Sequence, residues 1–208
     1  MGEFRRVRPK SRQAWRAWLE KNHASSKGVW LVYAKKHTGL ASLTYNDAVE
    51  EALCFGWIDN KINPIDEAFY MQIFTPRKAK SAWSALNRAR VKRLLAAGLI
   101  TSAGLAAIKA AKDAGTWNAM KQAEALIIPP DLRKAIKANP DASRHWASYS
   151  DSRRKGVLYR LADAKRPETR ARYLREIIES MARNLSHAER MAIAGFRPKA
   201  KSSKRAKR

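Results

Sequence analysis

Residues 44–59 read TYNDAVEEALCFGWID, and this stretch decides how the first half of the chain folds. Thr44 precedes Asp47 by three residues, which is close to the spacing of a capping box at a helix N-terminus. The residues that follow place an apolar side on that helix: Ala48, Val49, Ala52, Leu53 and Phe55. Gly56 is expected to end the helix in a left-handed conformation. Residues 57–59 then predict a strand, so a helix is followed directly by a strand.

The segments on either side extend this pattern into a sheet. Upstream, Ser11 is expected to cap a helix with Trp15, Trp18 and Leu19 on one side. Residues 29–33 (VWLVY) predict a strand, and their continuous apolarity predicts burial on both faces. Downstream, residues 60–64 predict a turn and Phe69–Thr75 a returning strand that Pro76 stops. A β-α-β-β unit follows from these assignments.

From Ser81 onward the spacing of apolar residues becomes helical. The residues expected to face the core of the first helices are Trp83, Leu86, Leu94, Leu95, Leu105, Ile108 and Ala111. Gly98 and Gly115 are expected to end them. Further helices are predicted over residues 130–138, around Trp146, and over residues 151–164 and 167–183. Ser186 and Glu189 predict one more capped turn.

The predicted fold class is α+β, with a small N-terminal β-sheet packed with helices and then an all-helical C-terminal module. Pro129-Pro130 is the best domain boundary, because two prolines interrupt the helical pattern. We therefore predict an N-terminal domain over residues 1–128 and a helical module over residues 129–196. Residues 197–208 contain too little apolar surface to fold alone, and a disordered basic tail is expected.

The net charge of +25 is the strongest feature of the composition. Residues 76–196 contain 25 Lys or Arg against 10 Asp or Glu, and residues 197–208 contain 7 against none. Most of the positive charge therefore belongs to the helical part, and an anionic partner is plausible. No apolar run reaches the roughly 20 residues of a membrane-spanning helix. The first residues lack the short apolar core of a secretory signal, so export by the usual route is not expected. With one cysteine and no internal disulfide, the expected location is the cytoplasm.

Several stretches resemble one known family. They are Arg8–Ser11, Gly28–Leu31, Leu43–Tyr45, Glu50–Asp59, Phe74–Arg77, Ser81–Asn87 and Lys165–Arg170. Together they are similar to the bacteriocin-protection family, also called YdeI or OmpD-associated (OmdA-like). The resemblance implies a link to envelope or antimicrobial-peptide stress and an association with an envelope protein. It implies no reaction and no catalytic residue. A chain at +25 should also repel cationic peptides, so any protection would be indirect.

No catalytic or cofactor motif is present in the sequence. Cys54 lies near the C-terminal end of its predicted helix and among acids, which disfavours a reactive thiolate, so we expect a buried structural thiol. The four histidines are scattered, so no metal site and no cofactor is predicted. An unrecognised enzyme remains an alternative, with Glu50 as a base and Tyr45 or Asp59 as a hydrogen-bonding group.

A ligand site is predicted between the segments Tyr45–Asp59 and Arg77–Trp83. A helix start after the strand end at Phe74-Thr75 attracts anions, and Arg77 and Lys80 add positive charge. Trp57 and Trp83 are expected to form apolar walls. Glu50 and Asp59 oppose an anion unless they hold basic side chains in place. The segment Arg77–Trp83 has a simpler interpretation, as a solvent-exposed connection between strand and helix whose Trp83 side chain packs in the core.

Three functions follow from the sequence. The first is an accessory or binding protein of the bacteriocin-protection type that acts in envelope or antimicrobial-peptide stress. The second is a protein that binds nucleic acid without sequence selectivity, through the basic helices and tail. The third is the unrecognised enzyme.

Overall fold

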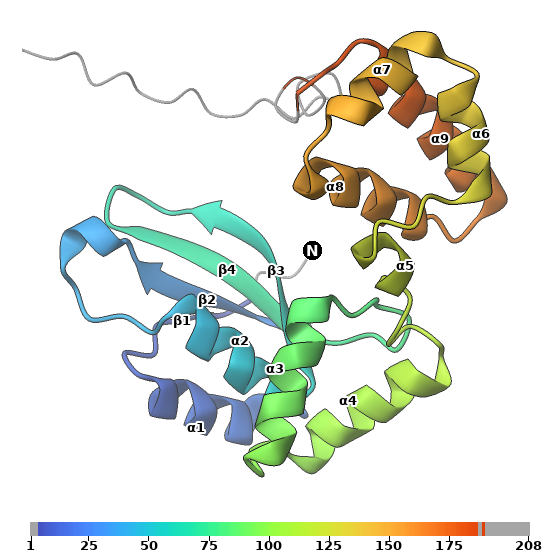
Figure 1. Ribbon diagram of the computed structural model, residues 1–208. Helices are drawn as coiled ribbons and strands as arrows, with labels where there is room; N and C mark the ends of the chain where they lie inside the picture. The colour runs from blue at the N-terminus through green and yellow to red at the C-terminus, as the bar shows by residue number, and fades with distance from the viewer. Residues whose placement is uncertain (1–3, 187–188, 190–208) are drawn as a thin grey trace, which may run out of the picture. The chain divides into compact units, whose positions relative to one another are not determined.

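The computed structural model describes residues 4–186 and residue 189, so the predicted tail at 197–208 lies outside the described residues. The chain forms two compact units, one ending at Met120 and one beginning at Lys121. The first contains a sheet with helices, and the described part of the second is helical (Figure 1). The α+β class is therefore confirmed. Pro130 begins a helix of the second unit, and the domain boundary at residues 128–129 stays a prediction.

The sheet has four strands in the order β1-β2-β4-β3. Their bounds are β1 (Arg6–Val7), β2 (Val29–Ala34), β3 (Trp57–Pro64) and β4 (Phe69–Pro76). β1 pairs with β2 in parallel, and the other pairs are antiparallel. Two features differ from the prediction. β1 was not predicted, and β3 continues through residues 60–64, where a turn was expected. Pairing with β4 supplies the hydrogen bonds there, and an irregular register between Asp59 and Ile62 accommodates the polar residues.

The sheet has one buried face, so the prediction that β2 is buried on both faces is wrong. Val29, Leu31 and Tyr33 are buried, while the residues between them are half-buried. The buried face is covered by α1 (Arg12–Asn22) and α2 (Tyr45–Cys54), as Figure 1 shows. A short 3-10 turn, η1 (Lys36–Thr38), leads from β2 toward α2. A continuous apolar run does not reveal this alternation, because half-buried positions also accept apolar residues.

The two helices on the sheet begin where their caps predict. The Ser11 hydroxyl accepts a hydrogen bond from the Ala14 amide (3.1 Å), and the Thr44 hydroxyl accepts one from Asp47 (3.1 Å). Trp15 is completely buried and donates from its indole nitrogen to the carbonyl oxygen of Ala48 (3.0 Å). Gly56 has φ +71, as expected for the residue that ends α2. These contacts fix α1 and α2 to one another above the sheet.

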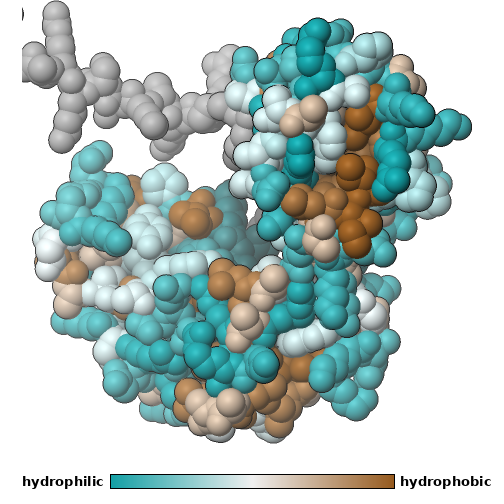
Figure 2. Space-filling view, in the orientation of Figure 1, coloured by the Kyte–Doolittle hydropathy of each residue, from teal (hydrophilic) through white to brown (hydrophobic). Residues whose placement is uncertain are grey.

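α3 (Ala85–Ala96) and α4 (Ser102–Asp113) complete the first unit. α3 begins later than predicted, because Ser84 provides the cap. Among the residues expected in the core, Leu86, Leu95 and Leu105 are instead exposed, whereas the other four named for these helices are buried. Figure 2 shows that apolar residues, in brown, lie among hydrophilic ones on the face in view. Helical spacing alone did not distinguish the two sides of these short helices.

Gly104 allows α4 to lie directly against the end of α2. The Cys54 carbonyl oxygen accepts hydrogen bonds from both the backbone amide (3.0 Å) and the hydroxyl (2.7 Å) of Thr101. A Cβ atom at Gly104 would lie 2.3 Å from that same oxygen. No side chain fits at this position, so the glycine is required by the close approach rather than by its backbone angles.

The second unit has its own core. Its helices are α5 (Lys121–Glu124), α6 (Pro130–Lys137), α7 (Pro140–Ser148), α8 (Asp151–Ala162) and α9 (Pro167–Ala182). The buried residues of this core include Leu132, Leu158, Leu161, Ile177 and Met181. Pro130, Pro140 and Pro167 each begin a helix, where a proline costs no hydrogen bond. Reciprocal hydrogen bonds between Ser186 and Glu189 confirm the last capped turn. Within the described ranges, no helix combines the length and apolarity needed to cross a membrane.

Candidate functional site

Five polar residues converge on the helix-covered side of the sheet. They are Tyr33 on β2, Tyr45 on α2, Asp59 on β3, and Tyr70 and Gln72 on β4, and we call them the Asp59 cluster. Tyr33 and Tyr70 are direct partners across the two strands, and their rings stack at 4.9 Å. Gln72 follows two residues after Tyr70 and therefore faces the same side. The strand register thus gathers polar groups on a surface that is otherwise apolar.

The Asp59 carboxylate is the centre of this cluster. Its Oδ2 atom accepts hydrogen bonds from the Tyr45 hydroxyl (3.1 Å) and from Nε2 of Gln72 (2.7 Å). Only the amide nitrogen of Gln72 can donate to a carboxylate, so this bond fixes the orientation of the side chain. The Oε1 atom of Gln72 therefore points away from the Asp59 carboxylate.

Two buried atoms of the cluster have no hydrogen-bond partner in the described structure. They are the Tyr33 hydroxyl oxygen and Oε1 of Gln72, on residues that are only 1% and 2% exposed. A buried polar atom without a partner costs about 1–3 kcal/mol. Such atoms are rare in native proteins, and a bound ligand or water is a common reason for them. Tyr45 is 42% exposed, so the cluster reaches the surface through this side chain.

The tyrosine hydroxyls of the cluster are protonated at neutral pH, and burial extends this state to higher pH by raising each pKa. It raises the pKa of Tyr33 far above its ordinary value, and Tyr70 and Asp59 act in the same direction. Burial and the neighbouring Asp59 carboxylate likewise raise the pKa of Tyr45. The cluster therefore presents hydroxyl groups that donate or accept, an amide oxygen that accepts, and one carboxylate.

Arg77 lies near this cluster and is held by Trp83. Its guanidinium is 3.8 Å from the centre of the Trp83 ring and donates to the carbonyl oxygen of Ala82 (2.9 Å). Burial lowers the pKa of Arg77 to about 10, although the charge of Asp59 opposes this shift. Arg77 is therefore charged at neutral pH and within electrostatic reach of Asp59. Its Nε atom is buried without a partner.

The structure brings some of the predicted site residues together and separates others. Tyr45 contacts Asp59, and Arg77 contacts Trp83. Glu50 lies elsewhere, because it pairs with Arg12 (3.1 Å) and Arg93 of other helices.

The two predicted tryptophan walls lie in the core. Trp57 and Trp83 are each 1% exposed, so neither ring offers an open wall to a ligand. Trp57 instead donates to the carbonyl oxygen of His23 (3.2 Å). Lys80 is exposed on the segment before α3. Ligand binding by any of these residues stays a prediction.

Tyr33, Tyr70 and Gln72 were missed by the sequence reasoning. Their common signal is polarity within strands that are otherwise apolar, and Gln72 stands out between Met71 and Ile73. Its proximity to Asp59 depends on the β3–β4 register, which includes the irregularity after Asp59. That register cannot be derived from the spacing of residues in the sequence.

Cys54 is fully buried, as predicted. Burial and the neighbouring Glu51 raise the pKa of its thiol to about 11, while Arg16 acts in the opposite direction. At neutral pH the thiol is therefore almost entirely protonated and a poor nucleophile. The described residues include no group of three His, Cys, Asp or Glu side chains arranged to hold a metal ion.

Comparison with known families separates the two units. Residues 7–107, which contain the whole Asp59 cluster, match a family described only as a domain of unknown function (DUF8412). Residues 125–184 match the family described as bacteriocin-protection, YdeI or OmpD-associated. We call residues 125–184 the bacteriocin-protection domain, after the family that they match. No curated protein and no solved structure matches the chain significantly.

The match confirms the resemblance and links the chain to bacteriocin protection. Of the stretches on which the resemblance rests, Lys165–Arg170 lies inside the bacteriocin-protection domain. The other six stretches all fall within the region of unknown function.

Several arginines of the bacteriocin-protection domain hold its helices together. Arg154 donates to the carbonyl oxygens of Trp146 (3.3 Å) and Ala147 (3.0 Å) at the end of α7. Arg153 donates to the carbonyl oxygen of Leu185 (2.9 Å), beyond α9. Other cations of this domain are exposed, and they include Arg133, Lys134, Lys137, Arg166, Arg172 and Arg175.

Proposed function

We propose that this chain is a binding protein of the bacteriocin-protection type, and that the Asp59 cluster holds a small polar ligand. The proposal extends the family link to a molecular role, in which the first unit recognises a ligand and the bacteriocin-protection domain contributes to the response. In this proposal the protein acts inside the cell, during envelope or antimicrobial-peptide stress. A binding role fits the protonated state of Cys54 and the separation of Glu50 from Tyr45 and Asp59.

One observation carries the proposal. The Tyr33 hydroxyl and Oε1 of Gln72 are both buried without a partner beside a carboxylate that already holds two donors. A ligand that hydrogen-bonds to both atoms would recover the free energy that their burial costs, about 1–3 kcal/mol for each. The stacked rings of Tyr33 and Tyr70 fix the position of the hydroxyl before any ligand arrives. A polar group that is already held in place loses little conformational entropy when it binds.

The decisive experiment separates binding from stability. Tyr33→Phe removes the unpaired hydroxyl but keeps the ring and its stacking on Tyr70. The melting temperature of the variant without ligand should remain the same or rise, because no hydrogen bond is lost. Neutral and charged metabolites that stabilise the natural chain should bind Tyr33→Phe at least about tenfold more weakly. Calorimetry measures the affinities.

Tyr173→Phe is the matched control, because it removes the same atom from the second unit. It should leave those affinities unchanged. Equal affinity of every ligand for Tyr33→Phe and the natural chain would overturn the proposal. So would a crystal structure in which one ordered water bonds to both atoms in the presence of saturating ligand.

A second function is favoured by the exposed cations of the bacteriocin-protection domain. They would attract nucleic acid through its phosphates, with no selection of sequence. Its test, a salt titration, is set out in the Discussion.

A further inference from the structure

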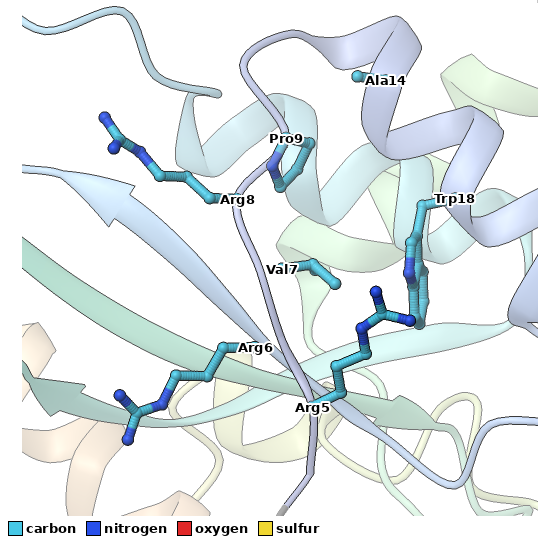
Figure 3. Close-up of a pocket in the computed structure, with 7 residues that line it drawn as sticks. All are labelled: Arg5, Arg6, Val7, Arg8, Pro9, Ala14 and Trp18. Carbon is cyan, nitrogen blue, oxygen red and sulfur yellow. The ribbon is translucent and has the colours of Figure 1, made fainter.

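A groove between β1 and α1 forms a second place where a ligand would fit. Its volume is about 330 Å³, and Figure 3 shows the side chains around it. Small-molecule sites span roughly 300–1,000 Å³, so the groove has room for a small ligand only. It belongs to a different part of the first unit from the Asp59 cluster, so a ligand could bind here whether or not the Asp59 cluster holds one.

Every ionisable side chain that the structure describes along this groove is cationic. Arg5, Arg6 and Arg8 follow one another along β1 and its ends. Arg8 lies over the ring of Phe69, with its guanidinium 4.3 Å from the ring centre. Arg5 and Arg6 are exposed and have no ion-pair partner among the described residues. Among the described residues of the groove, a carboxylate or phosphate would therefore meet positive charge and no acidic side chain.

The other lining residues are apolar, and Trp18 is the largest of them. They are Val7, Pro9, Ala14 and Trp18. The Trp18 ring stacks on Trp15 at 5.2 Å and meets the edge of Trp57 at 5.9 Å. These two buried rings hold Trp18 in place, so its half-buried ring is a fixed flat surface.

The side chains along β1 divide between two sides of the strand. In Figure 3 the Arg5 side chain extends toward the side of Trp18, whereas Arg6 and Arg8 extend to the opposite side. This division follows from the alternation of side chains along a strand. Arg5 is therefore the cation best placed to meet a ligand that packs on Trp18.

We infer that this groove binds a small organic anion that combines a flat apolar body with a carboxylate or a phosphate. The flat body packs against Trp18 and Val7, and the anionic group pairs with Arg5. Neither part alone is sufficient, because a surface ion pair contributes little net free energy and the groove is too small to bury a large apolar area.

The test uses four probes of matched shape or charge. 2-Naphthoate and 2-naphthyl phosphate carry both features, 2-naphthol lacks the charge, and inorganic phosphate lacks the flat body. In calorimetry, the two naphthyl anions should bind at least about tenfold more tightly than the other two probes. The relative affinity of carboxylate and phosphate identifies the preferred anion. Equal binding of 2-naphthol would overturn the inference, and so would no binding of either anion at about 1 mM.

Two variants locate the binding and one controls for charge. Arg5→Glu should weaken both naphthyl anions by at least about tenfold. Ala14→Phe should do the same by filling the groove from α1, without any change of charge. Lys10→Glu changes the net charge as much as Arg5→Glu, at an exposed residue outside the groove lining, and should have less than about a twofold effect. If Arg5→Glu and Lys10→Glu act equally, or if Ala14→Phe binds normally, the groove is not the site. Circular dichroism checks that each variant is folded.

Discussion

Two pairs of arginines, one in each unit, hold helices together in different ways. In the first unit, Arg12 and Arg16 of α1 pair with the buried carboxylate of Glu51 on α2, at 2.6 Å and 2.8 Å. In the second unit, Arg153 and Arg154 donate to backbone carbonyl oxygens at or beyond helix ends. A carboxylate cancels the charge of its arginine, whereas a carbonyl oxygen leaves it in place.

This difference bears on the charge of the whole chain. Residues 1–120 contain 20 Lys or Arg against 9 Asp or Glu, and residues 121–208 contain 23 against 9. Part of the excess in the second unit comes from arginines that its packing requires. A high positive charge is therefore not by itself a sign of an anionic partner, and the exposed cations must be tested separately.

The largest expected effect concerns those exposed cations. If the second unit binds nucleic acid, affinity should fall about a thousandfold between 50 and 200 mM salt, as expected for six or more phosphate contacts. Deleting residues 197–208 should reduce the slope without abolishing binding, because a net charge of about +18 remains. Fluorescence anisotropy with a labelled DNA or RNA duplex measures both.

Paired charge reversals locate the contact. Lys134→Glu with Lys137→Glu on α6 should weaken binding more than Lys10→Glu with Lys92→Glu in the first unit, although the net charge changes equally. Equal effects would show that only the total charge matters. Affinity that is independent of salt would contradict an electrostatic interface.

The next largest effect is expected on the stability of the first unit, where the Glu51 carboxylate pairs with two arginines. Glu51→Gln removes the charge that Arg12 and Arg16 share. Loss of one partner of a buried ion pair costs about 3–5 kcal/mol, and partial exposure of both arginines reduces the expected loss to about 2 kcal/mol. Urea unfolding followed by tryptophan fluorescence measures it, because six of the seven tryptophans lie before residue 121.

Glu67→Gln is the control, since Glu67 is exposed in the connection between β3 and β4. It should change stability by less than about 0.5 kcal/mol. A similar small change for Glu51→Gln would mean that the Glu51 ion pairs do not hold α1 to α2.

The smallest effect concerns the one carboxylate pair between α6 and α9. Arg170 binds Asp131 through two nitrogens, at 2.7 Å and 2.9 Å, and also donates to the carbonyl oxygen of Leu161 (3.2 Å). Arg170→Met should cost about 1 kcal/mol, because both side chains are about one-third exposed. Amide hydrogen exchange in α6 and α9 measures the loss locally. Arg175→Met, at an exposed position on α9, should have little effect.

The same pair predicts a dependence on pH. The hydrogen bond from Arg170 holds the pKa of Asp131 below its ordinary value. The Arg170–Asp131 pair therefore stabilises the fold in full above the pKa of Asp131 in the unfolded chain, which is about 4. This stabilisation is lost as the pH falls through the lower pKa of Asp131 in the folded chain. The natural chain should lose more protection between about pH 5 and pH 2 than Arg170→Met. Identical pH profiles would show that Asp131 is not stabilised by this pair.

The sequence predicted the features that depend on neighbouring residues. The helix starts at Ser11, Thr44 and Pro167 are correct, because a cap or a first-turn proline acts within one turn. Features set by pairing across the sheet were missed. β1 has only two residues and is defined by its partner β2, and the continuation of β3 depends on β4.

In the candidate site, likewise, the contact between neighbouring elements was predicted and the contacts across the sheet were not. Contact between Tyr45 and Asp59 joins two ends of the predicted helix-strand unit, and the sequence placed both residues in one site. Tyr33 and Gln72 join it only through the registers of β2 and β3 with β4. Trp57 and Trp83 were assigned to the site for their aromatic character. Both are instead buried in the core, where large apolar side chains pack most favourably.

The burial of the single cysteine makes this chain suited to distance measurements. Because the Cys54 thiol is inaccessible and protonated, a probe that reacts with thiolates would label introduced surface cysteines first. One cysteine at Lys10 and another at Lys137 would carry a pair of spin labels or fluorophores without any change to the natural core. The separation of the two units, and any change in it when a ligand binds, then becomes directly measurable in solution.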